Sequence, residues 1–242
     1  GRSVLGRTNI DGEGIAGLEK QYEDVLTGTS GSMTREVDPR QRTIAGSESI
    51  TQAPVDGDDL VLTLDRSIQF STEQVLLAQL ERIGAKGGTV IALDTPTGEV
   101  LGMASVRRDD DTGGYAVTNG NFAAVDAYEP GSVAKVITVA GALDAGAVTP
   151  DTTFTVPWRK QYADDLLKDS HEHPDLDLTV SDILTESSNI GTIMVQQALG
   201  RFEHHKYMTD FGLGERTALD FPGESDGILK EPDELWGSER VT

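Results

Sequence analysis

Apolar residues recur at helical spacing near the beginning of the chain. They are Leu18, Tyr22, Val25 and Leu26, which fall at i, i+4, i+7 and i+8 on one helix face. Gly28 follows, and glycine commonly ends a helix. The pattern predicts a short helix over residues 17–26, in a region (1–58) otherwise rich in Gly, Ser, Thr, Asp and Glu. Loose alternation over 35–56 indicates short strands in an extended arm.

The pattern changes at Asp58. Residues 60–64 form an apolar run that predicts a strand, and Asp65 is placed to cap a helix over 66–83. The predicted apolar stripe of this helix consists of Ile68, Val75, Leu76 and Leu80. The glycine pair Gly87-Gly88 is expected to end the helix.

A β-hairpin is predicted next. Residues 89–93 are expected to form a buried strand, residues 95–98 carry turn chemistry, and 99–104 are the return strand. Residues 105–128 are polar and predict a loop region. Its acidic run, Asp109 to Asp111, lacks the alternate spacing of cation ligands and is expected to be a solvated loop.

The most apolar helix is expected at residues 132–143, where the sequence is hydrophobic almost all round. Further helices are predicted near 180–184 and at 190–199, with a loop of mixed polarity before them. Residues 201–242 are expected to alternate short helices with Gly and Pro turns.

Composition narrows the class of protein. The 242 residues include 41 acidic and 20 basic side chains, giving a net charge of −21. This balance argues against nucleic acid as a partner and against electrostatic docking on anionic lipid. There is no cysteine, so disulfide and thiolate chemistry are absent, and no apolar run is long enough for a transmembrane helix.

Lys135 is the unusual residue of the apolar helix. Because a buried ammonium is costly, Lys135 needs polar partners or a lowered pKa. Ser132 lies three residues earlier, on the same helix face. A lysine of lowered pKa can take the proton of a neighbouring hydroxyl, which makes the serine a nucleophile. Backbone N–H groups of the first helical turn would favour negative charge on an attacked carbonyl.

A second polar group follows at Ser187-Ser188-Asn189, between two predicted helices. Its hydroxyl and amide could relay a proton and bind a substrate. Simpler interpretations exist for both groups. A serine and a lysine at this spacing often occur by chance, and Ser or Asn is a common helix cap.

Taken with their flanks, the two groups resemble a known family. Tyr128-Glu129-Pro130-Gly131-Ser132-Val133-Ala134-Lys135 and Glu186-Ser187-Ser188-Asn189-Ile190-Gly191 resemble the first two motifs of class B penicillin-binding proteins, the peptidoglycan D,D-transpeptidases. Weaker resemblances follow in order along the chain, at residues 14–22, 62–73, 211–214 and 220–224.

The resemblance implies a fold, namely an α/β (α+β) serine transpeptidase domain with a central antiparallel sheet flanked by helices. It also implies roles. Ser132 would be the nucleophile, Lys135 its base, Ser187 the proton relay and Asn189 the group that holds the substrate amide. The substrates would be stem peptides ending in D-Ala-D-Ala. β-Lactams would acylate the same serine, and no cofactor or metal is implied.

The resemblance also predicts a domain organisation and a location. Residues 1–58 would be a pedestal of dimerisation type, and 59–242 a transpeptidase domain incomplete at its C-terminal end. The protein would act outside the cytoplasm, anchored to the membrane through a segment absent from this chain. Division (divisome) or elongation proteins are the expected protein partners.

One element of the family pattern is missing. The third motif, K-T-G or K-S-G, does not occur: Lys206 and Lys230 are the lysines after Asn189, and neither precedes Thr-Gly or Ser-Gly. Because the chain reaches residues 236–242 before this motif would arrive, we expect a front fragment that is inactive by itself. Two alternatives stay open: a catalytically degenerate cell-wall scaffold, and a β-lactam hydrolase or sensor.

Other motifs are discounted. Residues 12–17 match G-x-G-x-x-G, but no hydrophobic strand precedes them as a dinucleotide site requires. His171 and His173 lie in a polar loop, and His204 and His205 are adjacent. Without a further matched ligand, neither pair predicts a metal site.

Overall fold

The computed structural model describes residues 1–235. The chain forms two compact units. The first consists of Gly1–Asp126 with Asp220–Glu224, and the second of Ala127–Leu219 with the stretch from Ser225 onward. Residues 236–242, where the chain is predicted to stop short of a third motif, lie outside the described residues. None of the helices in the described part is both long and apolar enough to cross a membrane.

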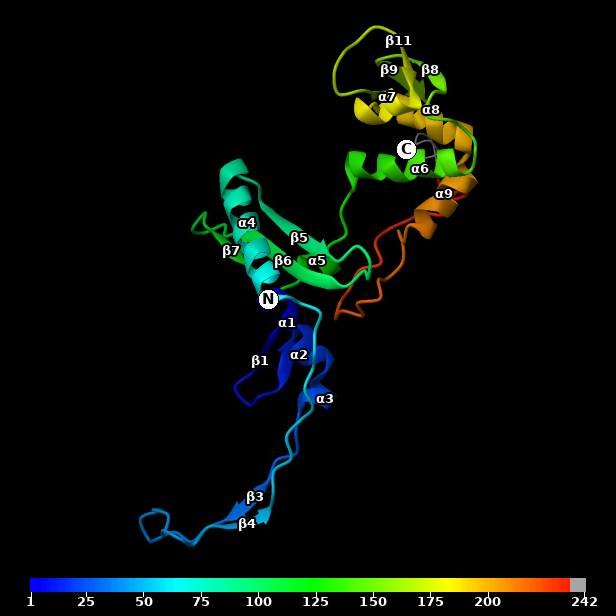
Figure 1. The fold of residues 1–242 in the computed structure, drawn as a ribbon. Coiled ribbons are helices and arrows are strands. Elements are labelled where there is room, and N and C mark those ends of the chain that lie inside the picture. The colour runs from blue at the N-terminus through cyan, green and yellow to red at the C-terminus, as the bar shows by residue number, and fades with distance from the viewer. Residues whose placement is uncertain (236–242) are drawn as a thin grey trace. The chain divides into compact units, whose positions relative to one another are not determined.

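The beginning of the first unit consists of short elements (Figure 1). They are α1 (Arg2–Leu5), β1 (Arg7–Thr8), β2 (Gly14–Ala16), α2 (Gly17–Gln21) and α3 (Glu23–Leu26). Strands β1 and β2 are antiparallel. The single helix predicted over 17–26 is wrong in one respect, because Tyr22 (φ −109°) breaks it into α2 and α3.

Gly17, the last glycine of the discounted G-x-G-x-x-G match, has a packing role. Its φ is +61°, and a Cβ there would lie 2.6 Å from the Cα of Gly6 and from the carbonyl oxygen of Val4. Close backbone contact therefore explains this glycine without a bound nucleotide.

The predicted arm is an antiparallel ribbon, but only one of its strands lies in the predicted range 35–56. Strand β3 (Ser32–Thr34), which precedes that range, pairs with β4 (Ser49–Gln52), and Thr29 forms a β-bridge with Val55. All residues of both strands are exposed. Backbone pairing therefore holds this ribbon, with little apolar burial.

The main sheet of the first unit is antiparallel, in the order β5-β6-β7. Its strands are β5 (Gly87–Leu93), β6 (Val100–Arg108) and β7 (Tyr115–Val117), and α5 (Phe122–Val125) follows. Helix α4 (Arg66–Ile83) packs on the sheet (Figure 1). Asp65 caps α4, as predicted, by accepting hydrogen bonds from the N–H groups of Ser67 and Ile68.

The packing face of α4 differs in part from the predicted stripe. Leu76 and Leu80 are buried against the sheet, but Val75 is 68% exposed. The buried face instead includes Gln69, whose side-chain amide bonds both backbone groups of Met103, at 2.8 and 2.9 Å. A paired amide can be buried at little cost, and hydropathy alone does not reveal that pairing.

Several predicted boundaries in this unit are wrong. Residues 60–64 form no strand, although Thr63 and Asp65 each bond a carbonyl of β6. Gly84, in the left-handed region (φ 69°), ends α4, so that Gly87 already belongs to β5. The polar loop predicted over 105–128 contains the end of β6, all of β7 and α5. The acidic run within it is a turn, in which Asp109 accepts bonds from Thr112.

The second unit is built from helices and two small antiparallel sheets. Its helical elements are η1 (Gly131–Ala134, a 3₁₀ turn), α6 (Lys135–Asp144), α7 (Val180–Thr185), α8 (Asn189–Leu199) and α9 (Arg201–Asp210). Its strands are β8 (Thr153–Val156), β9 (Arg159–Tyr162), β10 (Asp165–Lys168) and β11 (Leu176–Thr179). Strand β8 pairs with β11, and β9 with β10. The predicted loop of mixed polarity is therefore largely strand.

Helix α6 packs against α8 and α9, and α8 also contacts α7. Two glycines permit close approach. A Cβ at Gly141 would lie 2.7 Å from the ring of Tyr207, and one at Gly191 would lie 2.6 Å from Ile183. The core between these elements includes Val139, Ala142, Val180, Ile183, Ile190, Ile193 and Val195. The close helix packing holds the first turns of α6 and α8 together.

Candidate active site

Ser132 lies in an exposed turn at the beginning of a helix. The 3₁₀ turn η1 runs directly into α6, and the N–H of Lys135 donates to the carbonyl oxygens of Ser132 and Val133. Side chains three residues apart lie above one another in a 3₁₀ turn. Ser132 and Lys135 therefore lie on the same edge of the turn, and both line one cleft. Gly131 precedes them at φ +59°, a backbone conformation that suits glycine.

The predicted burial of this helix is only partly correct. Thr138, Val139 and Ala142 are buried, but Val133 is 74% exposed. A helix with apolar residues on every face can still have one face exposed to solvent. Here Ser132 lies on the exposed face.

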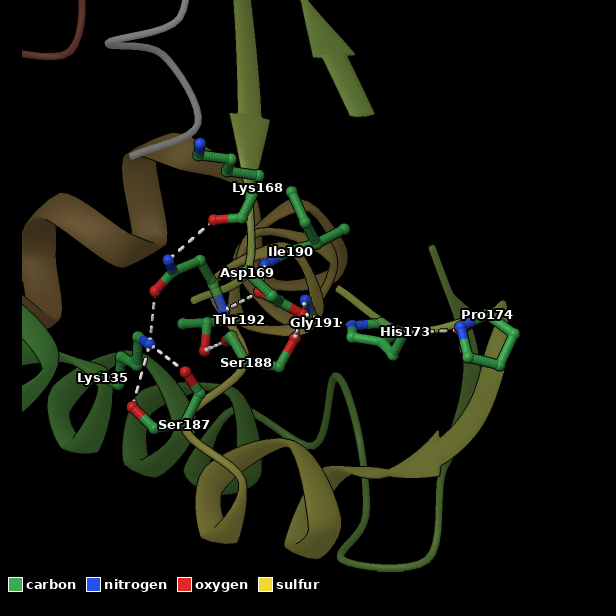
Figure 2. A network of polar contacts seen from close by, with 11 residues as sticks. Lys135, Lys168, Asp169, His173, Pro174, Ser187, Ser188, Ile190, Gly191 and Thr192 are labelled. Carbon is green, nitrogen blue, oxygen red and sulfur yellow. Dashed lines mark hydrogen bonds and ion pairs between the residues drawn. The ribbon is translucent and has the colours of Figure 1, made fainter. Parts of the chain in front are cut away.

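Lys135 is buried, with 9% of its surface exposed, and its ammonium has three polar partners. Nζ donates to the carbonyl oxygen of Ser187 at 2.5 Å, to Ser187 Oγ at 3.1 Å and to Asn189 Oδ1 at 2.6 Å (Figure 2). Burial lowers the pKa of Lys135, and the negative charge of Asp169 opposes that shift. A buried lysine is expected to need polar partners or a lowered pKa, and Lys135 has both.

Ser187 and Ser188 have different roles in the turn between α7 and α8. Ser187 has a left-handed backbone (φ 55°), unusual for a residue with a Cβ, and its side chain faces Lys135. Ser188 caps α8, because its Oγ accepts a hydrogen bond from the N–H of Gly191 at 2.8 Å. The capping interpretation therefore holds for Ser188, while Ser187 contacts the lysine.

Asn189 is held at both ends of its amide. Its Oδ1 accepts from Lys135, and its Nδ2 donates to the carbonyl oxygen of Lys168 at 2.9 Å. These two partners fix which end of the amide faces the lysine. An amide nitrogen has two hydrogens, and the bond to Lys168 uses one of them.

Asp169 is a further polar residue of the site, and no motif in the sequence marks it. It follows β10 and is buried, with 7% exposed. Its carboxylate accepts from Ser188 Oγ at 2.8 Å and from the N–H groups of Asn189 and Ile190 at 2.5 and 2.9 Å. Burial alone would raise the pKa of Asp169, but the hydrogen bonds, those from Ile190 and Ser188 foremost, lower it below its usual range.

His173 contacts the same carboxylate from another side. Its Nε2 lies 3.1 Å from Asp169 Oδ2, and its Nδ1 lies 2.7 Å from the carbonyl oxygen of Pro174 (Figure 2). Because both ring nitrogens face acceptors, the doubly protonated ring is favoured and the pKa of His173 is raised. In the described part of the chain, no group of His, Asp and Glu side chains is arranged to hold a metal ion.

The cleft in front of Ser132 has a volume of about 570 Å³. Its lining brings Ser132, Lys135 and Asn189 together with Thr138 and His204. His204 is buried beside Thr138, with 2.9 Å between Nε2 and the threonine Oγ1, and burial lowers its pKa.

Fold and site together define a class of protein. An exposed serine precedes a buried lysine by one turn, and a Ser-x-Asn turn bonds the lysine from the neighbouring helix. That combination is similar to the S-x-x-K and S-D-N motifs of β-lactamases and penicillin-binding proteins.

Comparison with known proteins gives the family. Residues 88–241 match the penicillin binding protein transpeptidase domain, and residues 6–62 match the penicillin-binding protein dimerisation domain. The chain belongs to the penicillin-binding protein transpeptidase family, and its expected α+β fold with antiparallel sheets is confirmed.

Relatives are found in several bacteria. Penicillin-binding protein PbpB of Mycolicibacterium smegmatis is 35% identical over 240 residues, which cover 98% of this chain and 37% of that protein. The probable peptidoglycan D,D-transpeptidase PenA of Neisseria gonorrhoeae is 35% identical over 232 residues, covering 94% of this chain and 39% of PenA. The chain thus spans well under half the length of these relatives.

A similar solved structure is penicillin binding protein 3 of Mycobacterium tuberculosis in its apo form. The TM-score is 0.82 at 32% identity, covering 99% of this chain and 51% of that chain. The same protein has been solved in complex with ampicillin, with a TM-score of 0.82.

Proposed function

We propose that this protein is a peptidoglycan D,D-transpeptidase that works through a serine acyl-enzyme. The observation that carries the proposal is the contact of buried Lys135 with Ser187 and Asn189, one turn from the exposed hydroxyl of Ser132. Family membership and the name of the PenA relative support the same chemistry.

In the proposed first step, Ser132 Oγ attacks the carbonyl carbon of the penultimate D-Ala of a stem peptide. Lys135, in its neutral form, takes the hydroxyl proton. Burial favours that form because it lowers the lysine pKa. The N–H groups at the beginning of η1 favour the negative charge that develops on the attacked oxygen.

Ser187 is suited to the next proton transfer. Of the three groups that accept from Lys135, its hydroxyl is the one that can also donate. It can accept from the ammonium and pass its own proton to the leaving amine. The C–N bond then breaks, D-Ala leaves, and an ester remains on Ser132.

An amine of a neighbouring stem peptide would then attack this ester and restore the serine, so that the two stems become joined by an amide bond. In this proposal the second Nδ2 hydrogen of Asn189 binds the amide oxygen of the substrate. β-Lactams would acylate Ser132 by the same first step. Such a reaction belongs outside the cytoplasm, where peptidoglycan is cross-linked. The membrane anchor, the division or elongation partners, and the domain boundary after residue 58 stay predictions.

Intact-mass analysis of the full-length protein with benzylpenicillin tests the proposal. We expect an adduct of one penicillin on the wild type, none on Ser132→Ala, and an unchanged adduct on the control Ser181→Ala, whose exposed serine lies on α7. A wild type without adduct, or an adduct that survives Ser132→Ala, would contradict it.

The lifetime of the adduct separates the remaining alternatives. A transpeptidase that β-lactams inhibit releases the acyl group slowly, so the adduct persists, whereas a β-lactam hydrolase releases it rapidly. A degenerate scaffold forms none.

A further inference from the structure

Asp169 touches none of the expected reacting atoms, yet its hydrogen bonds converge on the turn that holds Lys135. The carboxylate accepts from Ser188 Oγ, from the N–H of Asn189 and from the N–H of Ile190. Ser188 lies between the two residues that contact the lysine, Ser187 and Asn189. Each of these bonds therefore restrains the backbone next to a lysine partner.

We propose that Asp169 is a positioning residue for acylation, which holds the Ser187–Asn189 turn against Lys135 and supplies the negative charge that balances this lysine. The inference rests on the proposed function. Its geometric part follows from the three bonds and from the burial of the carboxylate. An interior carboxylate with several donors is a rigid anchor, because losing one partner leaves a buried polar group unsatisfied.

A purely capping role does not account for the arrangement. The cap of α8 is already supplied by Ser188, which accepts from Gly191. Asp169 adds bonds to the first two N–H groups of that helix and to the capping hydroxyl itself. First-turn N–H groups have no partner within their own helix, so Asp169 satisfies two such donors of α8 and at the same time restrains the turn that contacts Lys135.

The electrostatic part of the proposal concerns the charges around Lys135. Glu129, Lys168 and His204 line the same cleft, and His173 bonds Asp169 from the other side. In Figure 2, Asp169 lies between Lys135 and His173. Of these groups, Asp169 is the one whose charge raises the pKa of Lys135 against the effect of burial. Removing the charge therefore lets that pKa fall further.

The test is the pH profile of acylation by benzylpenicillin in the full-length protein, comparing wild type with Asp169→Asn. A lysine base gives a rate that rises with pH through the lysine pKa. For Asp169→Asn we expect a maximal rate lower by about 10-fold to 100-fold, because its Nδ2 would replace one of the two carboxylate oxygens, each of which accepts hydrogen bonds. We also expect the midpoint of the rise to move to lower pH.

Two further variants separate charge from geometry. Ser188→Ala keeps the charge of Asp169 and removes one of its bonds, so its rate should fall while the midpoint stays. Asp182→Asn removes a capping-box carboxylate of α7 in the same unit and should change neither quantity. A rate and midpoint equal to wild type in Asp169→Asn, or a lower rate with an unmoved midpoint, would contradict the proposal.

The outcomes distinguish this proposal from the proposed function. If the wild type forms no adduct, the transpeptidase proposal fails and this inference fails with it. If the wild type is acylated and Asp169→Asn behaves like Asp182→Asn, only the role of Asp169 is wrong. If a thermal melt shows that Asp169→Asn is not folded, Ser188→Ala tests the geometric part of the proposal. An unchanged acylation rate in Ser188→Ala would contradict that part.

Discussion

The two polar segments of the site are built in opposite ways. The turn that carries Ser132 is exposed, and within residues 1–235 its hydroxyl has no hydrogen-bond partner. The turn from Ser187 to Asn189 is bonded at every residue, to Lys135 on one side and to Asp169 on the other. The attacking group is accessible, and the groups that handle its proton are fixed.

The difference fits the demands of acyl transfer. A nucleophile must meet a substrate that arrives from solvent, whereas a base and a relay work best when they are already in place. The restraints of the structure are therefore concentrated behind the lysine. Variants in the two segments should therefore differ in their effects on acylation and stability.

Replacing the base should have the largest effect. Lys135→Met keeps the length and apolar stem of the side chain but removes its amine, so acylation of the full-length protein should slow by about 10²-fold to 10⁴-fold. The control Lys206→Met removes an exposed lysine of α9 that pairs with Asp210, and it should acylate at the wild-type rate. Stopped-flow measurement with benzylpenicillin gives both rates. Equal rates for the two variants would rule out Lys135 as the base.

The adjacent serines should differ in their effect on stability. Ser187→Ala loses a contact with Lys135 and should slow acylation, with little change in the free energy of unfolding. Ser188→Ala loses the cap of α8 and a bond to Asp169, and should reduce the free energy of unfolding by about 1–2 kcal/mol. Urea unfolding measures the second quantity. The reverse assignment, with Ser187→Ala the less stable variant, would mean that the roles of the two serines are exchanged.

Asp169, through its bonds from Ile190 and Ser188, and His173, through its bonds to Pro174 and Asp169, should make stability depend on pH at both ends of the range. Folding lowers the pKa of Asp169. Its contribution to the free energy of unfolding is therefore present above the unfolded pKa of about 3.9 and is lost as pH falls through the folded pKa. Folding raises the pKa of His173, so its contribution is full below the unfolded pKa of about 6.5 and is lost as pH rises through the folded pKa.

Urea unfolding across the pH range, with His173→Gln as the comparison, checks this linkage. The neighbouring charge of Asp175 acts on His173 in the same direction and is kept in both proteins. His173→Gln should lack the loss on the neutral-to-alkaline side and keep the loss in acid. A wild type whose stability is flat between pH 6 and 9 would contradict the linkage to His173.

The smallest effects concern two left-handed backbone positions. Gly131→Ala places a Cβ at φ +59° and should cost about 1–2 kcal/mol, although nothing crowds that position. Ser187→Gly removes a Cβ at φ +55° but frees the unfolded chain, so its free energy of unfolding should stay within about 1 kcal/mol of wild type. Thermal melts of both variants test the contrast, and a Ser187→Gly that is the less stable of the two would refute it.

The sequence predicted the parts of the site that depend on local spacing. Ser132 and Lys135 are three residues apart, and the caps at Asp65 and Ser188 depend on the next few residues. The meeting of Lys135 with Ser187 and Asn189 required the family resemblance, because no spacing rule relates residues so far apart.

Asp169 and the small strands could not be predicted in this way. Asp169 follows β10 in a stretch that is polar at first sight, and its partners lie on α8. The only local signal is that Asp169 is an acidic residue directly after a short segment that contains the apolar Leu167. Strand β8 pairs with β11 across an intervening hairpin, and such non-local pairing leaves little trace in short, Thr-rich segments.

The most direct test of the central claim is to locate the acyl group. Trypsin cleavage after Arg108 and Lys135 releases the peptide Asp109–Lys135, whose single serine is Ser132. Cleavage after Lys168 and Arg201 releases a second peptide, with Ser170, Ser181, Ser187 and Ser188. After reaction of the full-length protein with benzylpenicillin, mass spectrometry should find the adduct on the first peptide. An adduct on the second peptide instead would contradict the assignment of Ser132 as the nucleophile.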